Sequence, residues 1–128
     1  MEIQIAAIAD AVTLHQDGTA SALRLGVQEM TVPSLGSPVM LTVFVRALFT
    51  LDETEMAQVL ATEVWSPSGQ MVGSAEGLLT ISGASAVLPP GINHVAGLVF
   101  VPNEVGLHEV RIKVNQEVRH LPLYLTSH

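Results

Sequence analysis

The segment from Gly106 to Leu125 constrains the fold of this chain more than any other stretch. Apolar and polar residues alternate on both sides of Asn115-Gln116, which is the pattern of a β-hairpin with a two-residue loop. This loop length sets Val110 opposite Leu121 and puts the apolar residues of both strands on one face. A hairpin with one apolar face needs a partner layer, so the pattern predicts a larger β structure.

Two residues of this hairpin do not fit a simple apolar face. The same register puts Arg119 opposite Ile112 on the core side. We therefore expect the hairpin tip to extend beyond the core, where water reaches both faces. Pro122 has no N–H to donate to a neighbouring strand, which predicts an edge position for the last strand.

The rest of the chain also reads as strands separated by turn residues. His15–Gly18 and Ser66–Gly69 carry turn signals, and only 52–61 could instead form a helical turn. Alternation or short apolar runs predict the remaining strands at 2–9, 23–27, 39–51, 57–65, 70–82 and 92–101. We therefore predict a single all-β domain over residues 1–128. Its expected form is a two-layer antiparallel β-sandwich, immunoglobulin-like, with seven or eight strands.

One short phrase supports the sandwich prediction. Glu104-x-Gly106-x-His108-x-Val110 resembles the tyrosine-corner phrase of immunoglobulin-like sandwiches, with His108 in the place of the tyrosine. His108 shares the parity of Val110, so we expect a half-buried ring that hydrogen-bonds to a nearby loop carbonyl. Gly106 and His108 are therefore predicted to form a structural corner.

The chain as a whole resembles a bacterial family of small β-sandwich proteins of uncharacterised function. The matching words are Ile8-Ala9-Asp10 followed by Asp17-Gly18, Ser66-Pro67-Ser68-Gly69, Gly106-x-His108 leading to Val114-Asn115, and Leu121-Pro122-Leu123. The family usually has an aromatic residue at the position of His108 and a glycine in the hairpin turn. The resemblance implies the sandwich fold and carries no catalytic residue with it.

The composition points to a protein interface. The chain is 48% hydrophobic and only 13% charged, and the 39–51 strand is apolar on one face and half apolar on the other. A strand with two apolar faces is covered on both, and a partner or a loop must supply the second cover. We therefore expect a homo-oligomer or a subunit of a larger assembly. The predicted interface residues are Met40, Phe44, Arg46 and Leu48, with Arg46 hydrogen-bonded across the interface.

The charge balance excludes some partners. The net charge is −7, and the five basic residues do not cluster, so nucleic acid and anionic membranes are not expected partners. There is no cysteine and therefore no thiol nucleophile or cysteine-ligated zinc. The start of the chain lacks a basic region followed by an apolar run, and we expect a cytoplasmic protein without a cofactor.

The histidines allow one alternative function. Pro89-Pro90-Gly91-Ile92-Asn93-His94 matches a fragment of the second cupin motif, but no His-x-His pair supplies the other ligands. A small-ligand or metal site at His94 and the 83–94 loop is therefore the alternative. The acidic segment 52–55 could hold calcium loosely, although the EF-hand spacing is absent. No nucleophile elbow or phosphate loop appears, so we predict a non-enzymatic protein.

Overall fold

The computed structural model describes residues 1–53, 56–80 and 90–128, and these residues form an all-β protein with one 3-10 turn at Leu51–Glu53. The all-β prediction is confirmed. An eight-stranded sheet has the order β1-β5-β8-β7-β6-β9-β10-β4, and β2 and β3 form a separate pair. The strands are β1 (Glu2–Ala9), β2 (Ala11–Leu14), β3 (Ala20–Leu23), β4 (Glu29–Val32), β5 (Val39–Leu48), β6 (Gln58–Trp65), β7 (Met71–Leu79), β8 (Gly91–Phe100), β9 (Gly106–Val114) and β10 (Glu117–Ser127).

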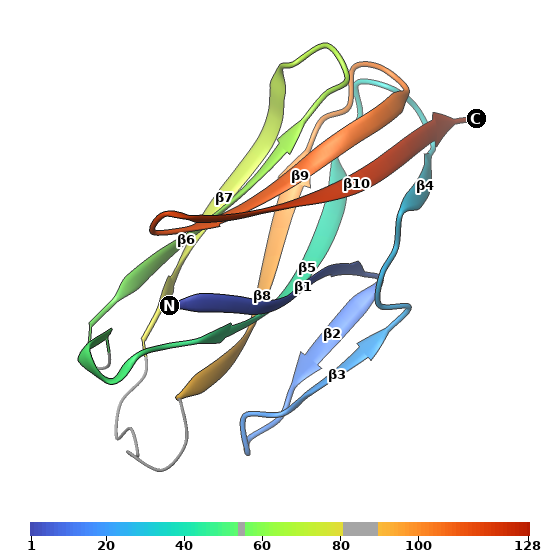
Figure 1. Cartoon of the computed structure of the whole chain (residues 1–128). Coiled ribbons are helices and arrows are strands. Elements are labelled where there is room, and N and C mark those ends of the chain that lie inside the picture. Colours follow the sequence, from blue (N-terminus) through green and yellow to red (C-terminus); the bar gives the residue numbers. More distant parts are fainter. Residues whose placement is uncertain (54–55, 81–89) are drawn as a thin grey trace.

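The large sheet curls around the core, and the ribbon of β9 and β10 passes in front of β5 and β8 in Figure 1. Inward-facing side chains fill the space between them. Leu41, Val43 and Val45 of β5 are buried, as are Val110 and Ile112 of β9. The alternation in each strand therefore places one face in the core, because successive side chains point to opposite sides of a sheet.

The terminal hairpin has the predicted register. Val114 pairs with Glu117, Val110 with Leu121, and the loop is Asn115-Gln116. Asn115 has a φ of +54°, whereas Gln116 is not among the residues with positive φ. A type I′ turn needs a positive φ at both loop residues, so the type I′ geometry common for such loops is not used here.

Water reaches the β10 side of the hairpin tip, where the Arg119 side chain stays 45% exposed, whereas Ile112 and Val114 of β9 are buried. β1 lies against this part of β10, and the Ile3 N–H donates to the Glu117 carboxylate at 3.0 Å. The Arg119 guanidinium donates to the Ile3 carbonyl oxygen at 2.8 Å and pairs with Glu117 at 2.8 Å. In the described residues no main-chain ladder joins β1 to β10. The side chains of Glu117 and Arg119 connect these two strands instead.

The predicted strand at 23–27 is also wrong. Arg24 and Gly26 both have positive φ, so the chain turns after β3 and forms β4 instead. β4 pairs in parallel with the end of β10, from Tyr124 to Ser127. The last strand is therefore not an edge over this half. Pro122 lies where β10 pairs with β9 alone, a position that needs no second donor.

The two halves of the large sheet meet at a short joint. Between β7 and β8, the registered pair in the described residues is Gly73 with Phe100. A Cβ on Gly73 would overlap the Cβ of Phe100, so this close approach requires glycine. Toward Leu79 and Gly91 the two strands have no paired residues in the described chain.

The outer side of β5 and β8 is partly covered by the chain itself. The β2–β3 hairpin contacts both strands, and Figure 1 shows it beside the lower part of the sheet. The Asn93 side-chain amide donates to the carbonyl oxygen of Gly18 in the β2–β3 turn at 2.8 Å. The β2–β3 hairpin therefore supplies part of the cover that the apolar residues on the outer face of β5 require.

Candidate functional site

The outer face of β5 and β8 carries the residues that the sequence marked as an interface. β5 presents Met40, Thr42, Phe44, Arg46 and Leu48 on this side, opposite Val99, Gly97, Val95, Asn93 and Gly91 of β8. None of these ten residues is acidic, in a chain whose net charge is −7. Interface cores are depleted of charged residues, and this face has that composition.

One end of this face is exposed and apolar. Met40 is 63% exposed, and its cross-strand partner Val99 is 49% exposed. Two more apolar side chains are exposed: Val101 directly follows β8, and Leu35 lies in the segment before β5. Large apolar side chains that lie side by side in water form a patch available for contact with another surface.

The middle of the face is already packed. Phe44 is only 8% exposed, and Leu48 is partly buried. Phe44 pairs with Ala7 of β1 on one side and Val95 of β8 on the other. Phe44 and Leu48 were predicted as interface residues, but their side chains pack mainly against neighbours within the chain. Met40, in contrast, projects into solvent.

Arg46 makes its hydrogen bonds within the chain. Its Nε donates to the Gln4 side chain at 2.9 Å, and its Nη1 donates to Asn93 at 3.0 Å. Asn93 in turn holds the β2–β3 turn through Gly18. The guanidinium thus links β1, β5 and β8 and fixes the hairpin that contacts them.

The outer face of β6, β9 and β10 has the opposite character. Lys113 pairs with Glu63 at 2.9 Å, and the Trp65 indole N–H donates to the same carboxylate at 3.0 Å. The Arg111 guanidinium lies 4.4 Å from the Trp65 ring centroid. The Lys113 and Trp65 donors lower the pKa of Glu63, because they stabilise its charged form.

The same network continues to β10. Glu109 accepts hydrogen bonds from Arg111 and, at 2.7 Å, from His120. The Arg111 donor, followed by His120, lowers the pKa of the Glu109 carboxyl. Compensated charges of this kind suit a hydrated surface, so the two outer faces of the sheet differ in their chemistry.

The corner residues occupy the start of β9. Gly106 has a φ of +119°, and a Cβ there would approach Pro67 at 3.3 Å. His108 is fully buried rather than half-buried, and its Nδ1 is 3.1 Å from the Gly106 carbonyl oxygen. Glu104 accepts a hydrogen bond from the Ser68 N–H at 2.7 Å, which ties the corner to the 66–69 turn.

The proposed metal ligands do not converge in the described chain. Across residues 1–53, 56–80 and 90–128, no group of three His, Cys, Asp or Glu side chains could hold a metal ion. His94 points toward β7 and is half-buried. Residues 54–55 of the acidic segment and 83–89 of the 83–94 loop lie outside the described residues.

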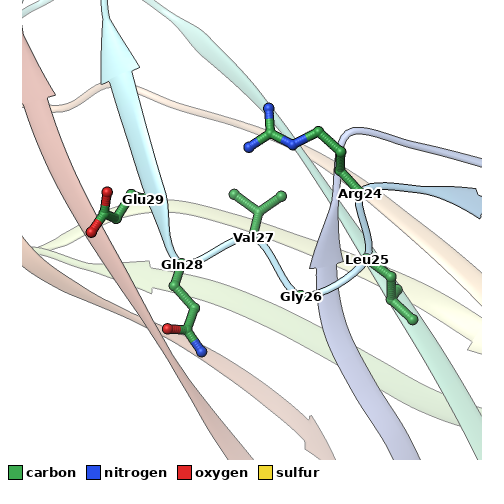
Figure 2. Close-up of a pocket in the computed structure, with 6 residues that line it drawn as sticks. All are labelled: Arg24, Leu25, Gly26, Val27, Gln28 and Glu29. Carbon is green, nitrogen blue, oxygen red and sulfur yellow. The ribbon is translucent and has the colours of Figure 1, made fainter.

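A groove of about 440 Å³ follows the turn between β3 and β4. Figure 2 shows Arg24 and Val27 on one side of this connection, and Leu25 and Gln28 on the other. Arg24 pairs with Asp10 at 3.3 Å on an exposed surface. The groove residues do not form a nucleophile–base pair, and we assign no chemistry to it.

No family model matches this sequence, and no curated protein matches it either. The resemblance to a bacterial β-sandwich family therefore stays a prediction. Among the described residues, no helix has the length and apolarity needed to cross a membrane.

Sequence reasoning missed Val99 and the β2–β3 hairpin as parts of the candidate site. Alternation had placed Val99 on the second face of its strand. Its position beside Met40 depends on the β5–β8 register, which pairs two residues that are 59 positions apart in the chain and has no local signal.

Proposed function

We propose that this protein is a non-enzymatic β-sandwich that acts by assembling with a second copy of itself. The surface that associates is the outer face of β5 and β8, centred on Met40 and Val99. Arg46, Phe44 and Leu48 hold this face in shape.

The observation that carries this proposal is the unequal charge of the two outer faces. The ten outward positions of β5 and β8 hold one charged residue, Arg46. The face of β6, β9 and β10 holds Glu63, Lys113, Glu109 and Arg111 in ion pairs. Ion pairs of this kind keep a surface hydrated, whereas a face without them loses little solvation when it is covered.

A second copy is the occupant that fits this charge pattern best. Two chains that each carry a net charge of −7 repel one another through most surfaces. The outer face of β5 and β8 contributes no carboxylate, so two copies can bring it together without opposing acidic groups. A two-fold arrangement would then cover Met40 and Val99 of both copies with the same contact.

The experiment is light scattering of the purified protein after size-exclusion chromatography at tens of micromolar. We expect a dimer or a larger symmetric oligomer, and a monomer for Met40→Glu, because a carboxylate would then face its copy in the contact. The matched control is Leu107→Glu, which changes a residue of similar exposure, 59%, on the charged face. This control should keep the oligomeric state of the wild type.

Two outcomes would overturn the proposal. The first is a wild-type protein that is monomeric across this concentration range. The second is an oligomer that Met40→Glu leaves intact but Leu107→Glu dissociates, which would place the contact on the other face. Circular dichroism of each variant confirms that its strands are formed.

We also infer that the curled sheet is an immunoglobulin-like two-layer sandwich. One layer would hold β1, β5 and β8, and the other β7, β6, β9, β10 and β4. In the part of the chain that the structure describes, β7 and β8 share one registered pair, Gly73 with Phe100, which supports a division at that point. Amide hydrogen exchange tests it: we expect slow exchange at the β6–β9 ladder and fast exchange at β7 amides that face β8. Uniform protection across the β7–β8 joint would contradict the division.

A further inference from the structure

A hollow of about 530 Å³ lies beside β4 and adjoins the groove at the β3–β4 turn. Its lining comes from the residue after β1, the β3–β4 turn, β4 and the last part of β10. Small-molecule sites in proteins commonly have volumes of about 300–1,000 Å³, and this hollow falls in that range. Its size therefore suits a ligand built from one or two six-membered rings.

The side chains of β4 and β10 that line the hollow are open to solvent. Tyr124 pairs with Glu29 across the parallel ladder of the two strands. Thr126 pairs with Thr31 two residues further on, and their hydroxyl oxygens are 3.0 Å apart. Residues two apart on a strand share a face, so these side chains lie together. Tyr124 is 48% exposed and the others are exposed as well, so a ligand can reach them from solvent.

Arg24 adds a guanidinium group with donors to spare. Its side chain is 72% exposed, and in the described chain it forms one ion pair, with Asp10 at 3.3 Å. A donor bond of 3.0 Å or less holds each of the other basic residues, Arg46, Arg111, Lys113 and Arg119. A guanidinium has five N–H donors, so Arg24 can bond to a ligand and keep its contact with Asp10.

The main chain at Arg24 is strained. Its φ is +52°, in the left-handed region that side chains other than glycine rarely adopt. The Ile8 carbonyl oxygen holds this turn, because it accepts from the N–H groups of Gly26 at 2.8 Å and Val27 at 3.0 Å. Figure 2 shows Arg24 and Val27 on the same side of the connection, and both line the hollow. Strained residues that the surrounding structure maintains are concentrated at ligand-binding and active sites.

The charges that line the hollow favour a neutral ligand. Two carboxylates, Asp10 and Glu29, stand near one guanidinium, Arg24, so neither a simple anion nor a simple cation matches the lining. A hydroxyl group donates to a carboxylate and accepts from a guanidinium N–H at the same time. A ligand with several hydroxyls would use this mixture of donors and acceptors. The Tyr124 ring adds an apolar surface, which suits the C–H face of a sugar ring.

We propose that the hollow between the β3–β4 turn and the end of β10 binds a neutral sugar unit. Hydroxyl groups of the sugar bond to Arg24, Glu29 and the threonine pair, and one C–H face of its ring lies against Tyr124. This site does not depend on the homo-oligomer proposed above, because its residues do not belong to the outer face of β5 and β8.

The test is an NMR titration of isotope-labelled protein with four neutral probes, the methyl glycosides of glucose, galactose, mannose and N-acetylglucosamine. We expect at least one of them to give saturable shifts of the Arg24, Glu29, Thr31 and Tyr124 amide resonances at millimolar concentration. Sodium acetate and methylammonium chloride each supply one ligand-like charge without hydroxyl groups. Neither salt should give saturable shifts at these amides.

The Arg24→Gly variant separates binding from stability. Glycine relieves the left-handed strain, so the midpoint of urea denaturation should rise, whereas the loss of the guanidinium donors should weaken sugar binding at least about tenfold. Asn115→Gly is the matched control, because it also places glycine at a positive φ but lies outside the hollow. It should raise the midpoint and bind the sugar like the wild type. A residue that only shaped the turn would not give opposite effects on stability and binding.

Two variants of Tyr124 test the contact with the ring. Tyr124→Phe keeps the ring and should keep most of the affinity, whereas Tyr124→Ala should weaken sugar binding about fivefold. Leu107→Ala is the control, because Leu107 is the cross-strand neighbour of Tyr124 on β9 and does not line the hollow. This control should bind the sugar like the wild type.

Three results would overturn the inference. The first is the absence of saturable shifts with any of the four sugars. The second is an acetate or methylammonium ion that binds at the same amides at least as tightly as the sugars, which would make the hollow an ion site. The third is sugar binding that either Arg24→Gly or Tyr124→Ala leaves unchanged, which would place the sugar elsewhere. None of these results bears on the oligomeric state measured by light scattering.

Discussion

Arg119 donates a hydrogen bond to the main-chain carbonyl oxygen of Ile3 at 2.8 Å, across a separation of 116 residues. Glu117 accepts from the Ile3 N–H at 3.0 Å and pairs with Arg119. Side chains of β10 therefore satisfy both polar groups of one β1 residue. Edge strands with free main-chain groups can pair with other chains, and this contact covers part of that edge.

Replacing Arg119 should weaken the closure of the sheet. We expect Arg119→Met to lower the free energy of unfolding by about 1 kcal/mol, since the Ile3 carbonyl loses its partner while the apolar stem is kept. Urea denaturation measures this change. Arg24→Met is the control, because the Arg24 side chain is 72% exposed and pairs only loosely with Asp10. Equal losses in the two variants would contradict the role of Arg119.

The β7–β8 joint should not tolerate a side chain at Gly73. We expect Gly73→Ala to destabilise the fold by about 2–4 kcal/mol, because the added methyl would overlap Phe100. Gly97→Ala, also in this part of the sheet, is the control. Its Cβ would meet nothing within 4 Å, and little change is expected. Thermal unfolding of both variants gives the comparison, and similar transition temperatures would show that the joint can adjust.

The hairpin loop should accept glycine at Asn115. This residue holds a φ of +54°, which glycine adopts without the steric cost that other residues pay. We expect Asn115→Gly to be stabilised by a few tenths of a kcal/mol and Asn115→Val to be destabilised by about 1 kcal/mol. Gln116→Ala, at the neighbouring loop position, should change stability little. Chemical denaturation checks the order of the variants, and a less stable glycine variant would contradict the turn assignment.

The Glu63–Lys113 pair should make stability depend on pH in the acid range. The pKa of Glu63 is lowered in the folded protein, so its contribution is present above the unfolded pKa and is lost as pH falls through the folded pKa. We expect Glu63→Gln to cost about 0.5–1 kcal/mol at neutral pH and nothing once the carboxyl is protonated, well below pH 4. Denaturation of both proteins across this range tests the prediction. A constant difference at all pH values would show that the cost has another origin.

Local patterns were sufficient for much of the fold. Alternation identified β1, β5, β6 and the terminal hairpin, and the loop at Asn115-Gln116 determined the pairing of Val110 with Leu121. The period of two assigns every residue to a face once one pair is known. The buried inner face of β5 followed from the same rule.

Local patterns failed where the chain turns without a strong signal. Arg24 adopts a left-handed conformation that its own side chain does not favour, so β3 ends at Leu23, where the predicted strand 23–27 was expected to begin. β4 was missed because four residues are too short for a clear alternation. Its parallel pairing with β10 covers the edge from Tyr124 to Ser127, whereas Pro122 lies before this pairing begins.

For the candidate site, too, some features follow from local sequence patterns and others depend on tertiary contacts. The sequence alone determined that this chain is all β, that its last two strands form a hairpin in a defined register, and that β5 is apolar on one face and half apolar on the other. Only the tertiary structure decided that Val99 lies beside Met40, that Arg46 bonds within the chain, and that Thr62 is buried opposite Ala75. The physical reason is that alternation and turn residues act over a few positions. Strand neighbours and cavities depend instead on contacts between residues far apart in the chain, as the bond from Arg119 to Ile3 shows.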